Sequence, residues 1–193
     1  STIIIDHGIR PAAAQEAARS AQRMRQCGIA ATIRRVTAAA PSSGIQPWAR
    51  EQRYAIATAY ARQQGGVLLL GQHAGDQAET VWMRLNRGSG LAGLAGMRAL
   101  VQRDGVVMLR PLLSFQRQEL EQICWHAGVT WETDPSNSDL QFERVQVRAT
   151  LAEMPDMVEQ LQRLAAAASV IDDHLLQAVA DAGSLVQLAP DGS

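Results

Sequence analysis

The sequence predicts an α/β fold in which a doubly wound parallel sheet is followed by a helical extension. In residues 1–150, short apolar segments alternate with longer segments of helical periodicity. In residues 151–193, no segment has the composition of a strand. Polar residues follow several of the expected strands directly. Strands that alternate with helices imply a parallel sheet, and ligands of such sheets bind at the carboxyl ends of the strands.

The first two expected strands flank a helix. Thr2–Asp6 is a short apolar run that ends at an acid, which is typical of a buried strand. The expected helix covers Ala12–Cys27, with Pro11 before it and Gly28 as its C-terminal breaker. Ala31–Val36 is rich enough in β-branched residues to form the second strand.

The rest of the chain continues the alternation. A loop over residues 38–46 leads to a long helix, Pro47–Gln64, whose apolar positions recur at helical spacing. The later extended segments are expected at Val67–Leu70, Val106–Leu109 and Val129–Glu132, and the later helices at Asp76–Asn86, Ser114–Ala127 and Val158–Ala182. We expect an α/β domain over residues 1–150 and a helical extension over residues 151–193.

Composition favours an ordinary globular protein without a membrane segment. Hydrophobic residues make up 47% of the 193 residues, which is enough for a core. No apolar run approaches the roughly 20 residues that cross a bilayer. Residues 1–6 have neither the basic segment nor the cleavage site of a signal peptide. We therefore expect a cytoplasmic protein with no membrane partner.

Charge and cysteine usage argue against two other classes. The net charge is −1, with 18 basic and 19 acidic residues, so no strongly basic composition marks a nucleic-acid binder. Every basic residue is arginine, which suits phosphate contacts but is also typical of GC-rich codon usage. Cys27 and Cys124 are far apart and form no CxxC pair, which argues against zinc and iron–sulfur sites.

Residues 71–90 concentrate the side chains that could carry chemistry. His73, Asp76 and Glu79 lie between an expected strand and the first turns of an expected helix. A structural interpretation is that Asp76 caps the helix and Glu79 completes a capping box. A functional one is that the helix N-terminus favours anions and the acid holds Mg²⁺ bound to phosphates. Arg84 and Arg87, further along the helix, could reach a polyanion or could be solvated.

A Gly-x-Gly-x-x-Gly pattern at residues 88–93 matches the residue spacing of a dinucleotide-binding fingerprint but not the structural context that the fingerprint requires. That fingerprint must follow a strand and open a helix, whereas this pattern follows a helix. We expect these glycines to form a flexible loop that lets the backbone approach a ligand closely.

Four segments occur in an order that is specific to one family. The first segment reads His-Ala-Gly-Asp-Gln-Ala-Glu-Thr at residues 73–80 and continues as Met-Arg-Leu-Asn-Arg-Gly-Ser-Gly-Leu-Ala-Gly-Leu-Ala-Gly-Met at residues 83–97. The other three segments are Asp-His-Gly-Ile-Arg-Pro at 6–11, Arg-Pro-Leu-Leu at 110–113, and Trp-Glu-Thr-Asp-Pro-Ser-Asn-Ser-Asp at 131–139, with Phe142, Arg144 and Arg148 following. Over about residues 3–150, the chain resembles the tRNA(Ile)-lysidine synthetases.

This family belongs to the PP-loop ATPases, so the resemblance implies a PP-loop fold and the use of ATP and Mg²⁺. It implies that ATP adenylates the C2 oxygen of the wobble cytidine in a tRNA(Ile) with a CAU anticodon. The amine of free L-lysine then attacks C2 and expels AMP, which leaves lysidine. Such a reaction depends mainly on positioning and charge stabilisation.

The resemblance also implies roles for individual residues. Asp6, His7 and Gly8 would line the nucleotide pocket. Catalysis would involve His73 and Asp76 beside the phosphates, Asp76 through Mg²⁺, and Glu79 on the lysine amine. The implied contacts to RNA or the reacting nucleotide come from Arg87, Asn137, Arg144 and Arg148.

The sequence departs from the family pattern at two places. Gly75 stands where the family usually has Asp or Asn, so any contact from that side chain is lost. The family's Ser-Gly-Gly-x-Asp-Ser loop, which cradles pyrophosphate, and the central strand before it have no counterpart in residues 1–193. We therefore expect this chain to be inactive by itself. We also expect an exposed sheet edge to produce either a homo-oligomer or a sheet that has closed the gap.

Two alternatives stay open. One is a non-catalytic nucleotide- or RNA-binding fragment, and the other is a different PP-loop tRNA-modifying ATPase such as a thiolase. Thiolases of the cytidine-modifying kind need clustered cysteines, whereas this chain has only Cys27 and Cys124.

Overall fold

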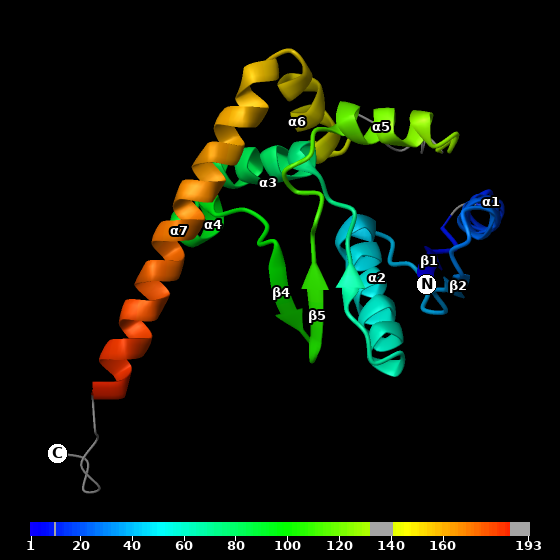
Figure 1. The fold of residues 1–193 in the computed structure, drawn as a ribbon, viewed down its shortest axis with the longest axis horizontal. Helices are drawn as coiled ribbons and strands as arrows, with labels where there is room; N and C mark the ends of the chain where they lie inside the picture. Colours follow the sequence, from blue (N-terminus) through cyan, green and yellow to red (C-terminus); the bar gives the residue numbers. More distant parts are fainter. Residues whose placement is uncertain (10, 132–140, 186–193) are drawn as a thin grey trace, which may run out of the picture. The chain divides into compact units, whose positions relative to one another are not determined.

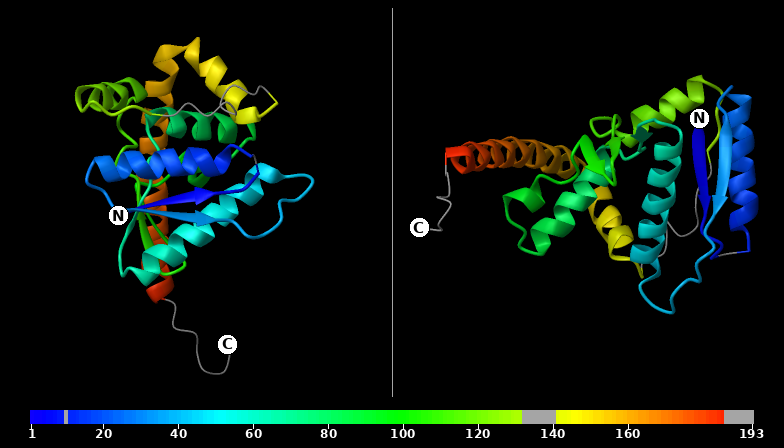
Figure 2. Two further views of the ribbon diagram at one scale, coloured as in Figure 1. Left: turned by 90° about the vertical axis from the view of Figure 1, so that its right-hand side faces the viewer. Right: turned by 90° about the horizontal axis from the view of Figure 1, so that it is seen from below.

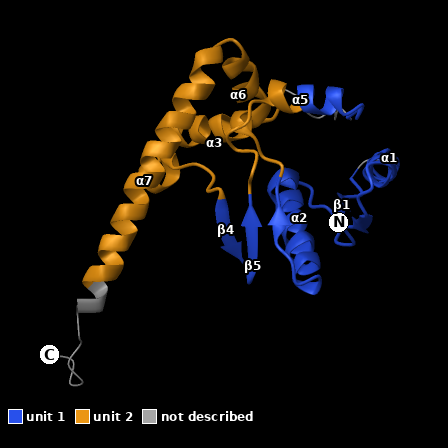
Figure 3. Cartoon of the chain, viewed as in Figure 1, with its two compact units in different colours: residues 1–70, 100–109, 121–134 blue, residues 71–99, 110–120, 135–193 orange. Residues whose placement is uncertain are grey.

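The computed structural model describes residues 1–9, 11–131 and 141–185. By its internal contacts the chain divides into two compact units, coloured separately in Figure 3. Unit 1 comprises residues 1–70, 100–109 and 121–134, and unit 2 comprises residues 71–99, 110–120 and 135–193. The units interleave along the sequence, and the expected linear boundary near residue 150 stays a prediction.

Unit 1 begins with a β-α-β arrangement. Strand β1 (Thr2–Asp6) and strand β2 (Ala31–Arg35) pair in parallel, with Thr2 opposite Ala31. Helix α1 (Ala13–Gln26) joins them and packs against both strands (Figure 2). The parallel pair and its crossover helix confirm the α/β fold expected from the sequence.

Helix α2 (Ile45–Gln63) forms the main core of unit 1. Its residues Tyr54, Ala57 and Ala61 are buried against residues of a second sheet, and Ile5 of β1 packs against the same cluster. The right-hand view of Figure 2 shows β1 and β2 between α2 and α1. Helices therefore cover both faces of the β1–β2 pair, as in a doubly wound domain.

The second sheet of unit 1 contains a strand that sequence reasoning missed. Strands β3 (Leu68–Leu69), β5 (Val106–Leu109) and β4 (Leu100–Arg103) lie in the order β3-β5-β4. β3 runs parallel to β5, but β4 is antiparallel to it. The β4–β5 turn is Asp104-Gly105, and both residues have positive φ. An Asp-Gly pair between apolar segments is a strong hairpin signal, so the sheet is mixed rather than wholly parallel.

Among the described residues, β1 pairs only with β2, and β3 pairs only with β5. The expectation that the sheet has closed its gap is therefore wrong, because the strands remain in two separate sheets. The described part of the expected segment Val129–Glu132 joins neither sheet. A homo-oligomer through an exposed edge stays a prediction.

Unit 2 is helical. It contains α3 (Ala74–Asn86), the short α4 (Leu91–Leu94), α6 (Glu143–Ala152) and α7 (Pro155–Leu185), and it shares α5 (Arg117–His126) with unit 1. Helix α7 packs against α3 and α4 (Figure 1). The core of unit 2 joins Ala78 and Val81 of α3 to Val147 of α6 and Leu161 of α7. None of the described helices is both long and apolar enough to span a membrane.

The glycine-rich segment of unit 2 contains the short helix α4 and is held to α3 by hydrogen bonds, and its expected flexibility stays a prediction. Arg84 donates through Nη1 to the carbonyl oxygens of Gly93 and Gly96, at 2.8 and 2.9 Å. The buried side chain of Gln77 exchanges two hydrogen bonds with the backbone of Met97. The close backbone approach permitted by Gly96 is thus to Gln77 of the same chain.

Candidate functional site

The start of α3 is held by a capping box that differs from the expected one. His73, not Asp76, is the N-cap residue, and its Nδ1 accepts a hydrogen bond from the backbone N–H of Gly75 at 3.0 Å. Asp76 Oδ2 accepts from the backbone N–H of His73 at 3.1 Å. Asp76 therefore has a structural role in addition to any chemical one. The expected capping-box role of Glu79 is wrong, because Asp76 occupies that position.

The geometry explains why glycine is tolerated at position 75. A Cβ added to Gly75 would lie 2.9 Å from Cε1 and 3.2 Å from Nδ1 of the His73 ring. Such a contact forces the ring to move. Glycine therefore lets the imidazole fold over the first turn of α3, where its Nε2 lies 3.6 Å from Asp76 Oδ2.

A buried carboxylate forms the centre of the candidate site. The side chain of Glu79 is only 4% exposed, and both of its oxygens bind arginines of α6. Arg144 Nε donates to Oε2, and Arg148 Nε donates to Oε1 at 2.6 Å. Arg144 also donates through Nη2 to Asp76 Oδ1 at 3.0 Å. The structure thus brings together Asp76, Glu79, Arg144 and Arg148, four of the residues singled out from the sequence.

Burial and charge account for the stability of this cluster. A buried carboxylate is costly unless it is paired and hydrogen-bonded. Two guanidinium groups satisfy Glu79, and the hydrogen bond to Glu79 raises the pKa of Arg148, against the opposing effect of desolvation. Because Arg144 and Arg148 are four residues apart, they lie one turn apart on the same face of α6.

Two other arginines of unit 2 lie in different environments. Arg87 is the C-cap residue of α3 and forms an exposed ion pair with Glu143, apart from the Glu79 cluster. Arg110 is buried, and it donates to Gln72 Oε1 at 3.2 Å and to the carbonyl of Arg98 at 2.8 Å. The Arg-Pro-Leu-Leu segment therefore contributes a structural contact. Asn137 lies outside the described residues.

The residues expected to bind nucleotide belong to unit 1 and follow β1. Asp6 is buried, and its Oδ1 accepts a hydrogen bond from the backbone N–H of Gly8 at 2.8 Å. Gly8 has a φ of +64°, a conformation that favours glycine. His7 Nδ1 is buried and has no hydrogen-bond partner among the described residues. Desolvation, followed by the positive charge of Arg53, lowers the pKa of His7, and Asp6 opposes the shift.

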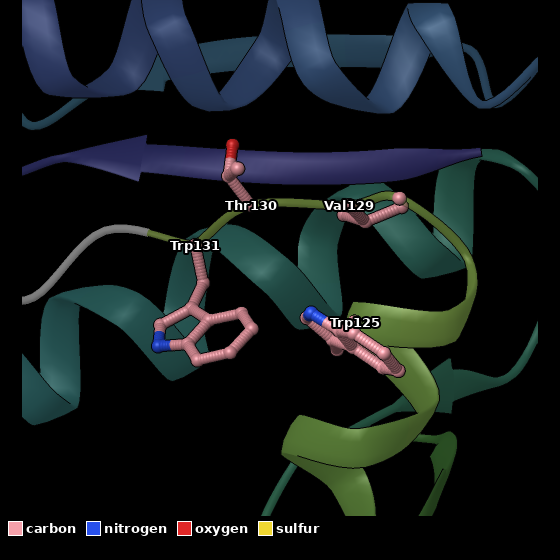
Figure 4. Close-up of a pocket in the computed structure, with 5 residues that line it drawn as sticks. Trp125, Val129, Thr130 and Trp131 are labelled. Atoms are coloured by element: carbon pink, nitrogen blue, oxygen red, sulfur yellow. The ribbon is translucent and has the colours of Figure 1, made fainter.

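Unit 1 also has an aromatic pocket for which the sequence suggested no role. Trp125 and Trp131 line a hollow of about 470 Å³ together with Val129, Thr130 and Gly128 (Figure 4). Both indoles are exposed, Trp125 to 74%. The sequence feature that could have indicated this pocket is the pair of tryptophans, six positions apart, on either side of Gly128.

No cluster of three or more His, Cys, Asp or Glu side chains suited to a metal ion occurs among the residues that the structure describes. Asp76 nevertheless offers a partly exposed carboxylate at a helix N-terminus. That donor set fits a Mg²⁺ ion only if substrate oxygens supply most of its ligands, which is usual for Mg²⁺ bound to phosphates.

The parallel β1–β2 pair, its flanking helices and the polar residues at the end of β1 define an α/β domain of the class that binds ligands at strand ends. The chain belongs to the PP-loop domain family, whose model matches residues 1–154. This match confirms the fold that the resemblance implied.

The curated relatives sharpen this assignment. The chain is 45% identical to the tRNA(Ile)-lysidine synthase of Novosphingobium aromaticivorans over 152 residues, which cover 77% of this chain and 46% of that protein. It is 40% identical to the enzyme of the same name from Zymomonas mobilis, over 79% of this chain and 48% of that protein. The chain thus spans about half the length of these relatives, and the resemblance drawn from the motifs is confirmed.

A solved structure supports the fold independently. The U34-tRNA thiolase NcsA from Methanococcus maripaludis superposes with a TM-score of 0.64 over 84% of this chain and 60% of that chain. The sequence identity is 17%, so the likeness concerns the fold alone.

Proposed function

We propose that the protein containing this chain is a tRNA(Ile)-lysidine synthase. It would use ATP to adenylate the C2 oxygen of the wobble cytidine in a tRNA(Ile) with a CAU anticodon. Pyrophosphate leaves in that step. The amine of free L-lysine then attacks C2, and AMP leaves with the former C2 oxygen. The observation that carries the proposal is the convergence of Asp76, Glu79, Arg144 and Arg148 in one cluster, in a chain that closely resembles synthases of this name.

The cluster has both charges that the reaction requires. Phosphate groups and the departing AMP are anionic, and arginine binds such groups through its planar fork. The lysine ammonium is a cation, and a carboxylate suits it. Of the two acids, Asp76 is 19% exposed and Glu79 only 4%, so Asp76 is the more accessible carboxylate for a cation. We assign the substrate cation, or a Mg²⁺ ion shared with phosphates, to Asp76.

The remaining assignments follow from position and chemistry. His73, with Nε2 near the carboxylate of Asp76, is proposed to assist at the phosphates. Asp6, His7 and Gly8 are proposed to line the nucleotide pocket, because ligands of this fold class bind where strands end. Arg87 and Asn137 are proposed as tRNA contacts. The cytoplasm is the proposed compartment, since the proposed substrate is a tRNA.

Incorporation of labelled lysine into tRNA(Ile) in the presence of ATP tests the proposal. The full-length gene product that contains this chain should transfer lysine only when ATP and the CAU-anticodon tRNA are both present. A tRNA(Met) with the same anticodon, offered at equal concentration, measures substrate selectivity. If no lysine is incorporated while ATP and tRNA still bind, the protein is instead a nucleotide- and RNA-binding protein without this activity.

A further inference from the structure

The two arginines beside Glu79 bind its carboxylate through their inner nitrogens. Nε of each arginine donates to one oxygen of the carboxylate. Nη2 of Arg144 donates to Asp76. Within the described residues, Nη1 of Arg144 and both Nη groups of Arg148 have no hydrogen-bond partner. In this part of the chain, three outer nitrogens of the pair are therefore left for a ligand.

Burial places the charges in two layers. The carboxylate of Glu79 is almost fully buried, whereas about a third of each arginine side chain is exposed, 36% for Arg144 and 35% for Arg148. A ligand that arrives from solvent therefore meets the guanidinium groups before the carboxylate. Guanidinium groups recognise phosphate oxygens by paired hydrogen bonds.

We propose that Glu79 is a positioning residue that holds Arg144 and Arg148 side by side as a two-point site for phosphate oxygens of the nucleotide or of the tRNA. The inference deepens the proposed function and rests on it. It assigns Glu79 a role through the arginines, in place of direct contact with the lysine amine. Long arginine side chains lose rotamer freedom when they bind, so fixing them beforehand strengthens binding.

The replacement Glu79→Gln separates this role from a simple charge effect, because the two predict opposite signs. Loss of a negative charge by itself strengthens the binding of phosphate groups. Loss of a positioning carboxylate weakens it, since an amide cannot accept both charge-assisted hydrogen bonds. We expect phosphate-dependent binding to weaken about tenfold, equivalent to the loss of one charge-assisted hydrogen bond.

The experiment uses the full-length gene product and two binding assays that contain no lysine. One measures the affinity for the tRNA(Ile) transcript without ATP, and the other the affinity for ATP without tRNA. The assay that responds to Glu79→Gln identifies which phosphates the arginines bind. Glu159→Gln is the matched control, because Glu159 lies in an exposed ion pair with Arg163 on α7 and its loss changes the net charge equally.

A double replacement tests whether Glu79 acts through an arginine. If it does, Glu79→Gln combined with Arg148→Ala weakens binding by less than the product of the two single effects, because one of the two arginines that Glu79 holds is already absent. A loss of affinity in the double variant that equals the product of the two single losses overturns the proposal. Unchanged or tighter binding by a folded Glu79→Gln variant in both assays also overturns it. Should that variant unfold, Glu79→Asp serves instead: it keeps the charge but is too short to reach both arginines, so weaker binding is again expected and wild-type binding refutes the proposal.

These outcomes are distinct from those of the lysine assay. A protein that fails to incorporate lysine, but loses phosphate affinity on Glu79→Gln, refutes the proposed function and keeps the positioning role. A protein that incorporates lysine, but binds phosphates equally well after the change, keeps the function and refutes the positioning role.

Discussion

Arg148 donates its Nε–H to Oε1 of Glu79 across 2.6 Å, which joins α6 to α3 over 69 residues of sequence. Replacing one partner of such a pair strongly destabilises the protein when the other partner is buried, because the remaining charge is left uncompensated. The pair therefore ties the chemistry of the candidate site to the packing of α3 against α6, and variants must be tested for folding as well as activity.

Asp76→Ala and Arg144→Ala should each lower lysine transfer by about 100-fold or more, as expected when one preorganised charge is removed from an active site. Asp76→Ala should also cost about 1 kcal/mol of stability, because Asp76 is part of the capping box of α3. Single-turnover lysine incorporation measures the first effect, and thermal unfolding followed by circular dichroism measures the second.

Arg163→Ala is a suitable comparison for Arg144→Ala, since Arg163 is an exposed arginine in an ion pair on α7. It should leave transfer within about twofold of wild type, because exposed pairs contribute little. Near-normal transfer by a well-folded Asp76→Ala or Arg144→Ala protein would remove that residue from the proposed site.

Gly96→Ala should destabilise the fold more than Gly88→Ala does. Both glycines have nearly the same positive φ, +67° and +68°. A Cβ at Gly96 would lie 2.6 Å from the buried Gln77 amide, whereas a Cβ at Gly88 would meet no atom of the described residues within 4 Å. The strained backbone costs roughly 1–2 kcal/mol in each variant, and the clash should add about 1–3 kcal/mol at Gly96.

Urea unfolding of the two glycine variants, monitored by circular dichroism, gives the difference in their free energies of unfolding. Equal values for the two would mean that Gln77 relocates at no cost. The contacts of Gln77 with Met97 would then contribute little to anchoring the glycine-rich segment.

Gly75 and His73 should be energetically coupled. In a His73→Ala background, Gly75→Ala should stabilise the protein by about 0.5–1 kcal/mol, the usual preference of a helix for alanine. With His73 present the gain should vanish, because the new Cβ displaces the ring and weakens a cap of about 1 kcal/mol. A double-mutant cycle of unfolding free energies measures the coupling, and additive effects would show that the ring moves freely.

The partly buried His7 should make the protein less stable in mild acid. Desolvation lowers the pKa of His7 in the folded state below the ordinary value of 6.5. As the pH falls through 6.5, the unfolded chain takes up a proton that folded His7 resists, so folding loses free energy until the pH passes below the folded pKa.

The free energy of unfolding, measured at pH 7.5 and at pH 5.5, tests this expectation for wild type and His7→Gln. The drop between the two values should be smaller in His7→Gln. His126→Gln is the control, because His126 is exposed, and its drop should equal that of wild type. An identical drop in His7→Gln and wild type would contradict the assignment of the pH effect to His7.

Local patterns in the sequence determined the elements that depend on near neighbours. The apolar run Thr2–Asp6 forms β1, and the helical periodicity after Pro47 lies within α2. The alternation of strands and helices, together with four ordered motifs, also determined the PP-loop family, which the match over residues 1–154 confirms. These inferences succeed because strand and helix periods are set by backbone geometry over a few residues.

Tertiary structure alone decided how distant residues meet. The sequence marked Glu79, Arg144 and Arg148 separately, but only the packing of α3 against α6 places both guanidinium groups on one buried carboxylate. Similarly, only tertiary structure showed that Gln77 binds the glycine-rich segment. Such contacts join residues far apart along the chain, and their free energy depends on burial and geometry that no local pattern contains.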